Sequence, residues 1–149
     1  MNENFVQNIT LAIQNKQVFE TSIEPKLIHQ NWTTIVNMID SHPKEYIKVE
    51  PHKNRTELQK LHLRESVKPI VKQLTSLLED ICPDKIITNI AFIGFGKHRS
   101  FPLHRDKMDV LLLQVKGRIK LTVGEINKVM NVGDVVYIPR GIDHEITPL

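Results

Sequence analysis

The sequence predicts a mainly β domain with some α-helix, in which a sandwich or barrel of short strands follows a helical N-terminal part. Apolar residues recur at helical spacing up to about residue 81. From residue 86 onward, short runs rich in β-branched residues alternate with glycine turns. The length of 149 residues suits a single domain, 1–149, with a mostly helical part at 1–85 and a barrel core at 86–149.

Three helices are expected in the N-terminal part, each from an apolar stripe with a recognisable start. Asn4 and Asn31 are candidate N-caps of the first two. Ser66 would cap the third, so that Pro69 falls in the first turn, where its missing N–H is not needed. Trp32 shares the spacing of its stripe and is therefore interpreted as a core residue. The stripes are Phe5, Ile9 and Ile13; Trp32, Ile35, Val36 and Ile39; and Val67, Ile70, Leu74, Leu77, Leu78 and Ile81.

Strands are expected mainly in the C-terminal part, where a hairpin turn is marked by Gly124. Two short stretches of the N-terminal part, Gln17–Ile23 and Tyr46–Glu50, also have strand character. The expected strands of the barrel core are Ile86–Phe95, Asp109–Val115, Arg118–Val123, Ile126–Met130, Val135–Ile138 and Asp143–Thr147.

Composition excludes several classes of protein. Cys82 is the only cysteine, which excludes an intramolecular disulfide and a cysteine-based zinc site and favours a reducing compartment. The longest apolar run, Val110–Leu113, is far shorter than the roughly 20 residues of a membrane span. The N-terminus lacks the basic start and apolar core of a signal peptide. We therefore expect a cytoplasmic protein with no membrane partner.

The charge gives no support for nucleic acid as a partner. Lysine and arginine total 20 against 17 aspartate and glutamate, a net charge of +3. Nucleic-acid binders usually concentrate such charge on one face. The best basic stripe, spaced four residues apart, is interpreted as the solvated face of a helix; it consists of Lys60, Arg64, Lys68 and Lys72.

Three residues of the β-rich part are suited to a metal ion. His104 and Asp106 stand two apart, so both side chains point to the same face of an extended segment. His144 follows a Pro-x-Gly turn at the start of the last strand. Two imidazoles and one carboxylate form a facial triad, whose usual occupant is iron(II), although manganese or nickel fits the same donors. The other histidines, which we expect mostly at the surface, are His29, His42, His52, His62 and His98.

The residues before His144 form a longer pattern. From Gly133 onward the chain reads G-x5-P-x-G-x2-H, which resembles the second conserved motif of the cupin superfamily. Gly133 and Gly141 suit tight turns, and Pro139 stiffens the corner between them. The asparagine that usually trails this motif is missing, since Pro148 stands four residues after the histidine.

A second resemblance narrows the family. Leu103–Gly117 reads LHRDKMDVLLLQVKG and resembles the H-x-D-x-x-D-V-F-x-L-Q-x-x-G segment of JmjC-like cupin oxygenases. Ordinary cupins have H-x-H there, so the carboxylate of Asp106 favours the oxygenase branch. The resemblance covers about 60 residues, 86–149, and implies a double-stranded β-helix (jelly-roll) barrel. It also implies a metal bound by His104, Asp106 and His144, with 2-oxoglutarate as a possible cosubstrate.

At the positions that bind 2-oxoglutarate in the family, this sequence matches the family pattern less completely than at the metal ligands. Asn89 stands where the family's first barrel strand often has a pocket-lining asparagine. The family's basic residue, two positions after the glycine of Q-x-x-G, is Ile119 here. Arg118 and Lys120 flank it and are the candidate cosubstrate-binding cations, but in a regular strand they alternate to the opposite face. A one-residue bulge near Gly117 would turn Lys120 inward.

Closure of the barrel needs strands from elsewhere. About six strands are expected after residue 85, whereas a complete double-stranded helix uses eight. The two N-terminal stretches, 17–23 and 46–50, would supply the difference. Alternatively a second subunit would cover the open edge, which would make the protein a homodimer.

Three functions remain open at this point. The first is an iron(II)- and 2-oxoglutarate-dependent oxygenase that hydroxylates a small-molecule or macromolecular substrate. The second is a metal-binding cupin that does not use 2-oxoglutarate, such as another dioxygenase or an isomerase. The third is a non-catalytic cupin that holds a small ligand. An apolar lumen for the second function is expected from Ile90, Phe92, Leu111, Leu113 and Tyr137.

Overall fold

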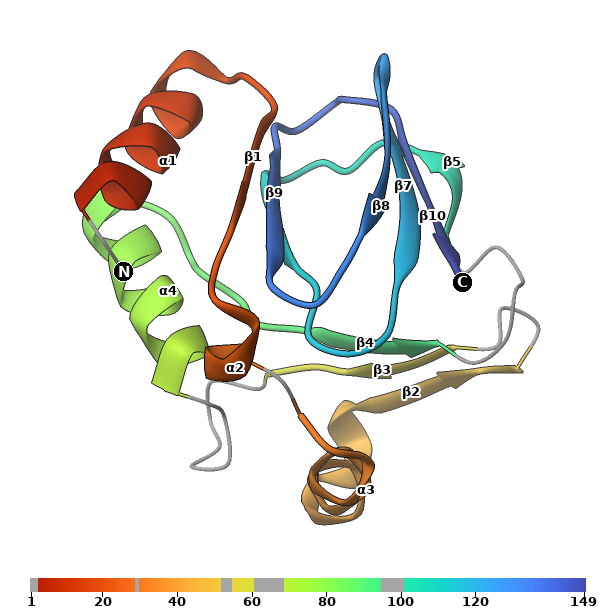
Figure 1. Ribbon diagram of the computed structural model, residues 1–149. Helices are drawn as coiled ribbons and strands as arrows, with labels where there is room; N and C mark the ends of the chain where they lie inside the picture. The colour runs from red at the N-terminus through yellow and green to blue at the C-terminus, as the bar shows by residue number, and fades with distance from the viewer. Residues whose placement is uncertain (1–2, 29, 52–54, 61–68, 95–100) are drawn as a thin grey trace. The chain divides into compact units, whose positions relative to one another are not determined.

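The protein is a mixed α/β chain with an N-terminal helix and antiparallel strands in three sheets (Figure 1). The chain divides into two compact units: the sandwich unit, residues 1–29 with 96–149, and the helix–sheet unit, residues 30–95. This division differs from the expected parts, 1–85 and 86–149, and it does not test whether the whole chain is one domain, which stays a prediction. The structure is a computed structural model, and it describes residues 3–28, 30–51, 55–60, 69–94 and 101–149.

The sandwich unit opens with helix α1 (Glu3–Asn15), which lies against strands β1 and β9 of the same unit. Its buried residues follow the expected stripe and include Phe5, Ile9 and Ile13. The predicted cap is wrong, because Asn4 lies inside the helix and its Oδ1 accepts a hydrogen bond from Asn8 Nδ2, 3.0 Å away.

The first sheet of this unit has the order β1–β9–β6, and all its pairings are antiparallel. The expected strand within Gln17–Ile23 is confirmed as β1. This N-terminal strand pairs with β9 near the C-terminal end of the chain. A short helix, α2 (Pro25–Ile28), follows β1. The bounds of the three strands are Phe19–Ser22 (β1), Asp134–Ile138 (β9) and Val110–Leu113 (β6).

The second sheet has the order β5–β10–β7–β8 and is also antiparallel. Strands β7 and β8 form the expected hairpin, in which Val123 pairs with Ile126 and Gly124 has φ 54°. Strand β5 was not expected, since it is short and contains Pro102, which is unfavourable in most strands. The bounds are Phe101–His104 (β5), His144–Pro148 (β10), Ile119–Val123 (β7) and Ile126–Met130 (β8).

The two sheets of the sandwich unit share one apolar core. Leu121 and Met130 of the second sheet pack with Val136 and Ile138 of the first, and each is at most 2% exposed. The strands therefore form a β-sandwich, and the described residues contain no closed barrel. The residues packed around this centre are Val18, Val110, Leu112, Ile119, Ile142 and Ile146.

The residues that the sequence predicted as the lining of an apolar lumen do not face the core of the sandwich unit. Val110 and Leu112 of β6 point into the core, so Leu111 and Leu113 point to the other side of the sheet. Tyr137 pairs with Leu111 and shares that outer face. Four consecutive apolar residues do not reveal which two face inward, and this is why the expectation failed. Ile90 and Phe92 belong to the helix–sheet unit, where they are 39% and 43% exposed.

The helix–sheet unit has a three-stranded antiparallel sheet, β2–β3–β4, and two helices. Its core centres on Leu58 of β3, which is fully buried against side chains from α3, α4, β2 and β4. The elements are α3 (Trp32–Ser41), the 3-10 helix η1 (Lys44–Tyr46), β2 (Ile47–Glu50), β3 (Arg55–Leu58), α4 (Pro69–Ile81) and β4 (Ala91–Gly94).

One of the two expected helix caps of this unit is confirmed. Asn31 caps α3, since its Oδ1 accepts a hydrogen bond from the Thr34 N–H at 2.7 Å. Helix α4 begins at Pro69, whereas the predicted cap Ser66 lies outside the described residues. Trp32 is 51% exposed, so its interpretation as core is wrong, because α3 buries Ile35 instead.

Two strands of the helix–sheet unit differ from expectation. The expected strand over Ile86–Phe95 is shorter, because β4 covers Ala91–Gly94 and Ile86 is 95% exposed. Strand β3 was not expected, since its residues (RTEL) are mostly polar. The expected strand within Tyr46–Glu50 is confirmed as β2, but β2 pairs with β3 in the sheet of the helix–sheet unit, so the expectation that it completes the barrel is wrong.

Two surface predictions can be compared with the structure. Of the basic stripe, Lys60 and Lys72 are exposed, and the Lys60 Nζ lies 4.1 Å from the centroid of the Tyr46 ring. The other two members, Arg64 and Lys68, fall outside the described residues. No helix in the described parts of the chain is long and apolar enough to cross a membrane.

Candidate metal centre

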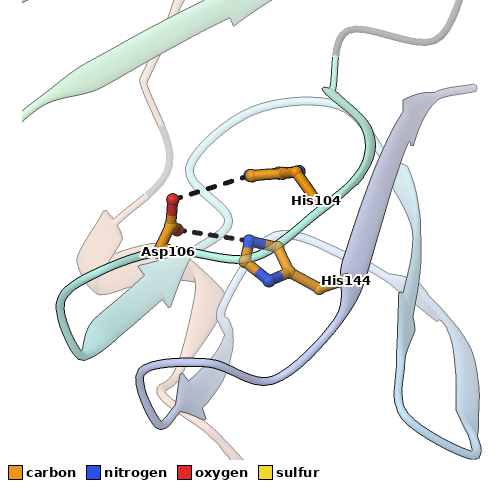
Figure 2. Close-up of side chains that lie close together, drawn as sticks. All are labelled: His104, Asp106 and His144. Atoms are coloured by element: carbon orange, nitrogen blue, oxygen red, sulfur yellow. Dashed lines mark ion pairs between the residues drawn. The ribbon is translucent and has the colours of Figure 1, made fainter.

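The side chains of His104, Asp106 and His144 converge at one end of the sandwich unit (Figure 2). Each offers one ligand atom, and these atoms all lie within 4.8 Å of one another. The two oxygens of the Asp106 carboxylate face different imidazoles: Oδ1 is 3.7 Å from His104 Nε2, and Oδ2 is 3.3 Å from His144 Nε2. The two rings are 4.2 Å apart between centroids. The fold thus brings together the three residues that the sequence singled out.

His144 is held on the inner face of the second sheet. It is the first residue of β10 and pairs with Val123, a core residue of β7. Because residues that pair directly share a face, the imidazole points toward the core side. Its side chain is 4% exposed. The Pro-x-Gly turn before it, with Gly141 at φ 82°, sets the point at which β10 begins.

His104 reaches the same face through an irregularity in β5. His144 pairs with His104 and Ile146 with Phe101, so two steps along β10 match three along β5. This is the geometry of a β-bulge, which re-aims a side chain without breaking the sheet. As a result Phe101 and His104 share the inner face, and their rings stack with centroids 5.8 Å apart. The bulge was not predictable from the sequence spacing.

Backbone carbonyls fix the tautomer of both imidazoles. Nδ1 of His104 lies 2.7 Å from the Pro102 carbonyl oxygen, and Nδ1 of His144 lies 3.0 Å from the Ile142 carbonyl oxygen. Carbonyl oxygens only accept hydrogen bonds, so in both rings Nδ1 carries the hydrogen and donates it. Each Nε2 is therefore the nitrogen left to bind an ion, and both Nε2 atoms face Asp106. Metal-binding histidines are commonly oriented by such an outer hydrogen bond.

Two hydrogen bonds donated by backbone N–H groups join the segment that carries Asp106 to the turn before His144. The Gly141 N–H donates to the Asp106 carbonyl oxygen at 3.0 Å, and the Arg140 N–H donates to Asp109 Oδ1 at 2.9 Å. The other oxygen of Asp109 accepts from Lys16 Nζ at 2.7 Å. These bonds hold together two segments that are far apart in the sequence.

A side-chain ion pair links the same two segments. Arg105 donates from Nε to Asp143 Oδ1 at 2.6 Å and from Nη2 to Asp143 Oδ2 at 2.9 Å. The hydrogen bond from Arg105 holds the pKa of the Asp143 carboxyl below its usual range, and the same bond raises the pKa of Arg105. The sequence patterns did not predict this pair. Its possible signal is that Arg105 and Asp143, which have opposite charges, each stand directly beside a candidate ligand.

The residues assigned to 2-oxoglutarate are not part of this cluster. Strand β7 pairs in regular register with β10 and β8 over Ile119–Val123, so the bulge that would turn Lys120 inward is absent. Ile119 packs against the core, and Lys120 is exposed on the opposite face. Arg118 is exposed before the strand, and its carbonyl oxygen accepts from the Leu149 N–H. Asn89 lies in the helix–sheet unit, where its Nδ2 donates to Thr75 Oγ1 at 2.9 Å.

Of the other histidines, the structure describes only His42. It is 3% exposed, and its Nε2 lies 2.7 Å from the Gln59 carbonyl oxygen in the helix–sheet unit, so His42 is an exception to the expectation that most of these histidines lie at the surface. The remaining four, His29, His52, His62 and His98, lie outside the described residues.

The donor set fits a divalent transition-metal ion. Two neutral imidazole nitrogens and one carboxylate are the protein ligands of the mononuclear non-haem iron(II) site. Comparison of the chain with models of known protein families and with curated protein sequences finds no match. The assignment of this site therefore depends on its own atoms, above all the two Nε2 atoms that converge on one carboxylate.

Proposed function

We propose that His104, Asp106 and His144 bind one divalent metal ion, for which iron(II) is the best fit, and that the protein is a metal-dependent oxygenase. The observation that carries this proposal is the convergence of three correctly oriented donors, which lie within 4.8 Å of one another. The donors come from two segments about 40 residues apart, and the hydrogen bonds at Nδ1 turn the Nε2 atom of each ring toward Asp106.

Exposure of the three ligands suits a catalytic ion better than a purely structural one. His144 is 4% exposed, whereas the side chains of His104 and Asp106 are 31% and 35% exposed. One side of the cluster thus adjoins the core, and the other is reachable from solvent. Three protein ligands leave further positions of an octahedral ion for substrate. A bound iron(II) ion would supply Lewis-acid and redox chemistry for oxidation by dioxygen.

The protein's own groups would bind the metal ion and orient its ligands. The two imidazoles and the carboxylate fix the ion's place, and the Pro102 and Ile142 carbonyl groups keep both rings turned toward it. The apolar core beside His144 keeps water from that side of the site. The family to which we assign these features is the JmjC-like cupins, and the sandwich unit would correspond to their jelly-roll. A reducing cytoplasm, which the lone Cys82 favours, would keep iron ferrous.

The 2-oxoglutarate-dependent form of this activity does not fit the described residues. It needs a cation on the inner face of the second sheet to bind the far carboxylate, and Ile119 stands where the family has one. Lys120 and Arg118 are exposed and away from that face. Lys128 pairs with Leu121 and so shares the inner face, but its Nζ forms an ion pair with Glu20 at 2.8 Å. This arrangement favours the second candidate, an oxygenase or isomerase that uses the metal without 2-oxoglutarate.

An anaerobic titration tests both parts of the proposal. Iron(II) is added to the protein first, and 2-oxoglutarate second, while the visible spectrum is recorded. We expect one iron per chain and no metal-to-ligand charge-transfer band after addition of 2-oxoglutarate, because Ile119 stands at the family's cation position and, among the described residues of the second sheet, the inward-facing Lys128 is already paired with Glu20. A band that disappears in the His104→Ala variant would contradict the form without 2-oxoglutarate. Failure to bind iron would contradict the metal site itself.

A further inference from the structure

We infer that the ion pair between Arg105 and Asp143 is a clamp that positions the metal ligands, so that both are positioning residues for the proposed site. This inference rests on the proposed metal centre and adds two residues to it. Arg105 stands between His104 and Asp106 in the sequence, and Asp143 directly precedes His144. The pair therefore joins the segment that carries two ligands to the segment that carries the third.

The geometry of the pair is specific. Two parallel hydrogen bonds, of 2.6 and 2.9 Å, run from Nε and Nη2 of Arg105 to the two oxygens of Asp143. Such a fork fixes direction as well as distance, whereas a single point charge fixes only distance. The backbone bond from Gly141 to Asp106 joins the same segments. The ion pair and the backbone bond together limit both separation and rotation of the segments.

Folding stability alone gives little reason for this pair. The side chains of Arg105 and Asp143 are 66% and 43% exposed, and exposed ion pairs contribute little to stability. The sandwich unit is stabilised by its apolar core, in which several side chains are fully buried. Metal binding is more demanding, because the ligands must be held to within about 0.5 Å of the productive geometry. The clamp acts on the ligand-bearing segments directly.

The charge of Arg105 allows the effect of the clamp on metal affinity to be distinguished from the effect of net charge. A guanidinium beside a cation site repels the metal, so Arg105→Gln should tighten metal binding if charge alone matters. If the pair is a clamp, the same variant weakens binding because the two segments separate. Arg105→Lys keeps the charge but loses the fork, so a weaker site in this variant cannot come from net charge.

The test is calorimetric titration of the apo-protein with cobalt(II), together with the ligand-field spectrum of the bound ion. We expect Arg105→Gln to weaken cobalt(II) binding by about 10- to 100-fold, as for loss of other groups that orient ligands. Arg105→Lys should fall between it and the wild type. The ligand-field bands should change in both variants, while the unfolding midpoint of the apo-protein stays the same.

Lys128→Gln is the matched control. Lys128 lies on β8, at the opposite edge of the sheet from β5, and its ion-pair partner Glu20 lies on β1. The variant removes one positive charge and should leave cobalt(II) affinity unchanged. Cobalt(II) binding by Arg105→Gln that equals or exceeds the wild type would overturn the clamp and leave the metal site standing. A wild-type protein that binds no cobalt(II) would overturn the clamp together with the metal site.

Discussion

Replacement of Asp106 by asparagine should abolish tight metal binding while leaving the sandwich unit folded. The carboxylate is the one anionic donor of the cluster, and its two oxygens face both imidazoles. Asparagine has the same shape but no charge, so the ion would lose a ligand and the compensation of its charge. We expect the iron(II) affinity to fall by at least roughly 100-fold, since even loss of outer-shell partners costs 10- to 100-fold.

The measurement is anaerobic titration with iron(II), with circular dichroism as the check on folding. The Asp106 side chain is 35% exposed, so its replacement leaves no buried void. Asp80→Asn makes the same chemical change at an exposed position of helix α4 and should leave the affinity unchanged. An Asp106→Asn protein that binds iron(II) as tightly as the wild type would remove Asp106 from the ligand set.

The second large effect concerns the core that supports the site. Leu121→Ala should reduce the free energy of unfolding by about 2–5 kcal/mol, because it removes a fully buried side chain from the middle of β7. Lys120→Ala, one residue earlier, should change it by no more than about 0.5 kcal/mol, since that side chain is exposed on the other face. Urea-induced unfolding of both variants measures the difference.

This pair of variants also tests the register of β7. The regular pairing of β7 places Ile119, Leu121 and Val123 inward, and it is the reason that Lys120 cannot bind a cosubstrate inside the sandwich. If the strand carried a bulge near Gly117, Lys120 would lie inside and Leu121 outside. A larger loss of stability for Lys120→Ala than for Leu121→Ala would therefore contradict the register and reopen the 2-oxoglutarate pocket.

Local patterns in the sequence predicted the features that depend on a few neighbouring residues. Asn31 marks a helix start through capping, an effect that operates within one turn. The candidate ligands were found in the same way. His104 and Asp106 are two residues apart, and a stiff Pro-x-Gly turn precedes His144. Their convergence, however, depends on the pairing of β10 with β5, a strand that the sequence did not predict.

Features that depend on tertiary pairing were not predictable from such patterns. The bulge in β5 is visible only from its register with β10, and it brings His104 and Phe101 to one face despite their spacing of three. The run Val110–Leu113 is apolar throughout, so only packing shows that Val110 and Leu112 face inward. Trp32 has the spacing of a core residue, yet α3 buries Ile35 and leaves Trp32 half exposed.

One metal ion is expected among His104, Asp106 and His144. The most direct test is an anomalous-scattering map from crystals of the protein grown anaerobically with iron(II). We expect one strong peak per chain, in contact with both Nε2 atoms and with the Asp106 carboxylate. Crystals that show ordered side chains at this cluster but no peak there, or iron bound only elsewhere on the chain, would contradict it.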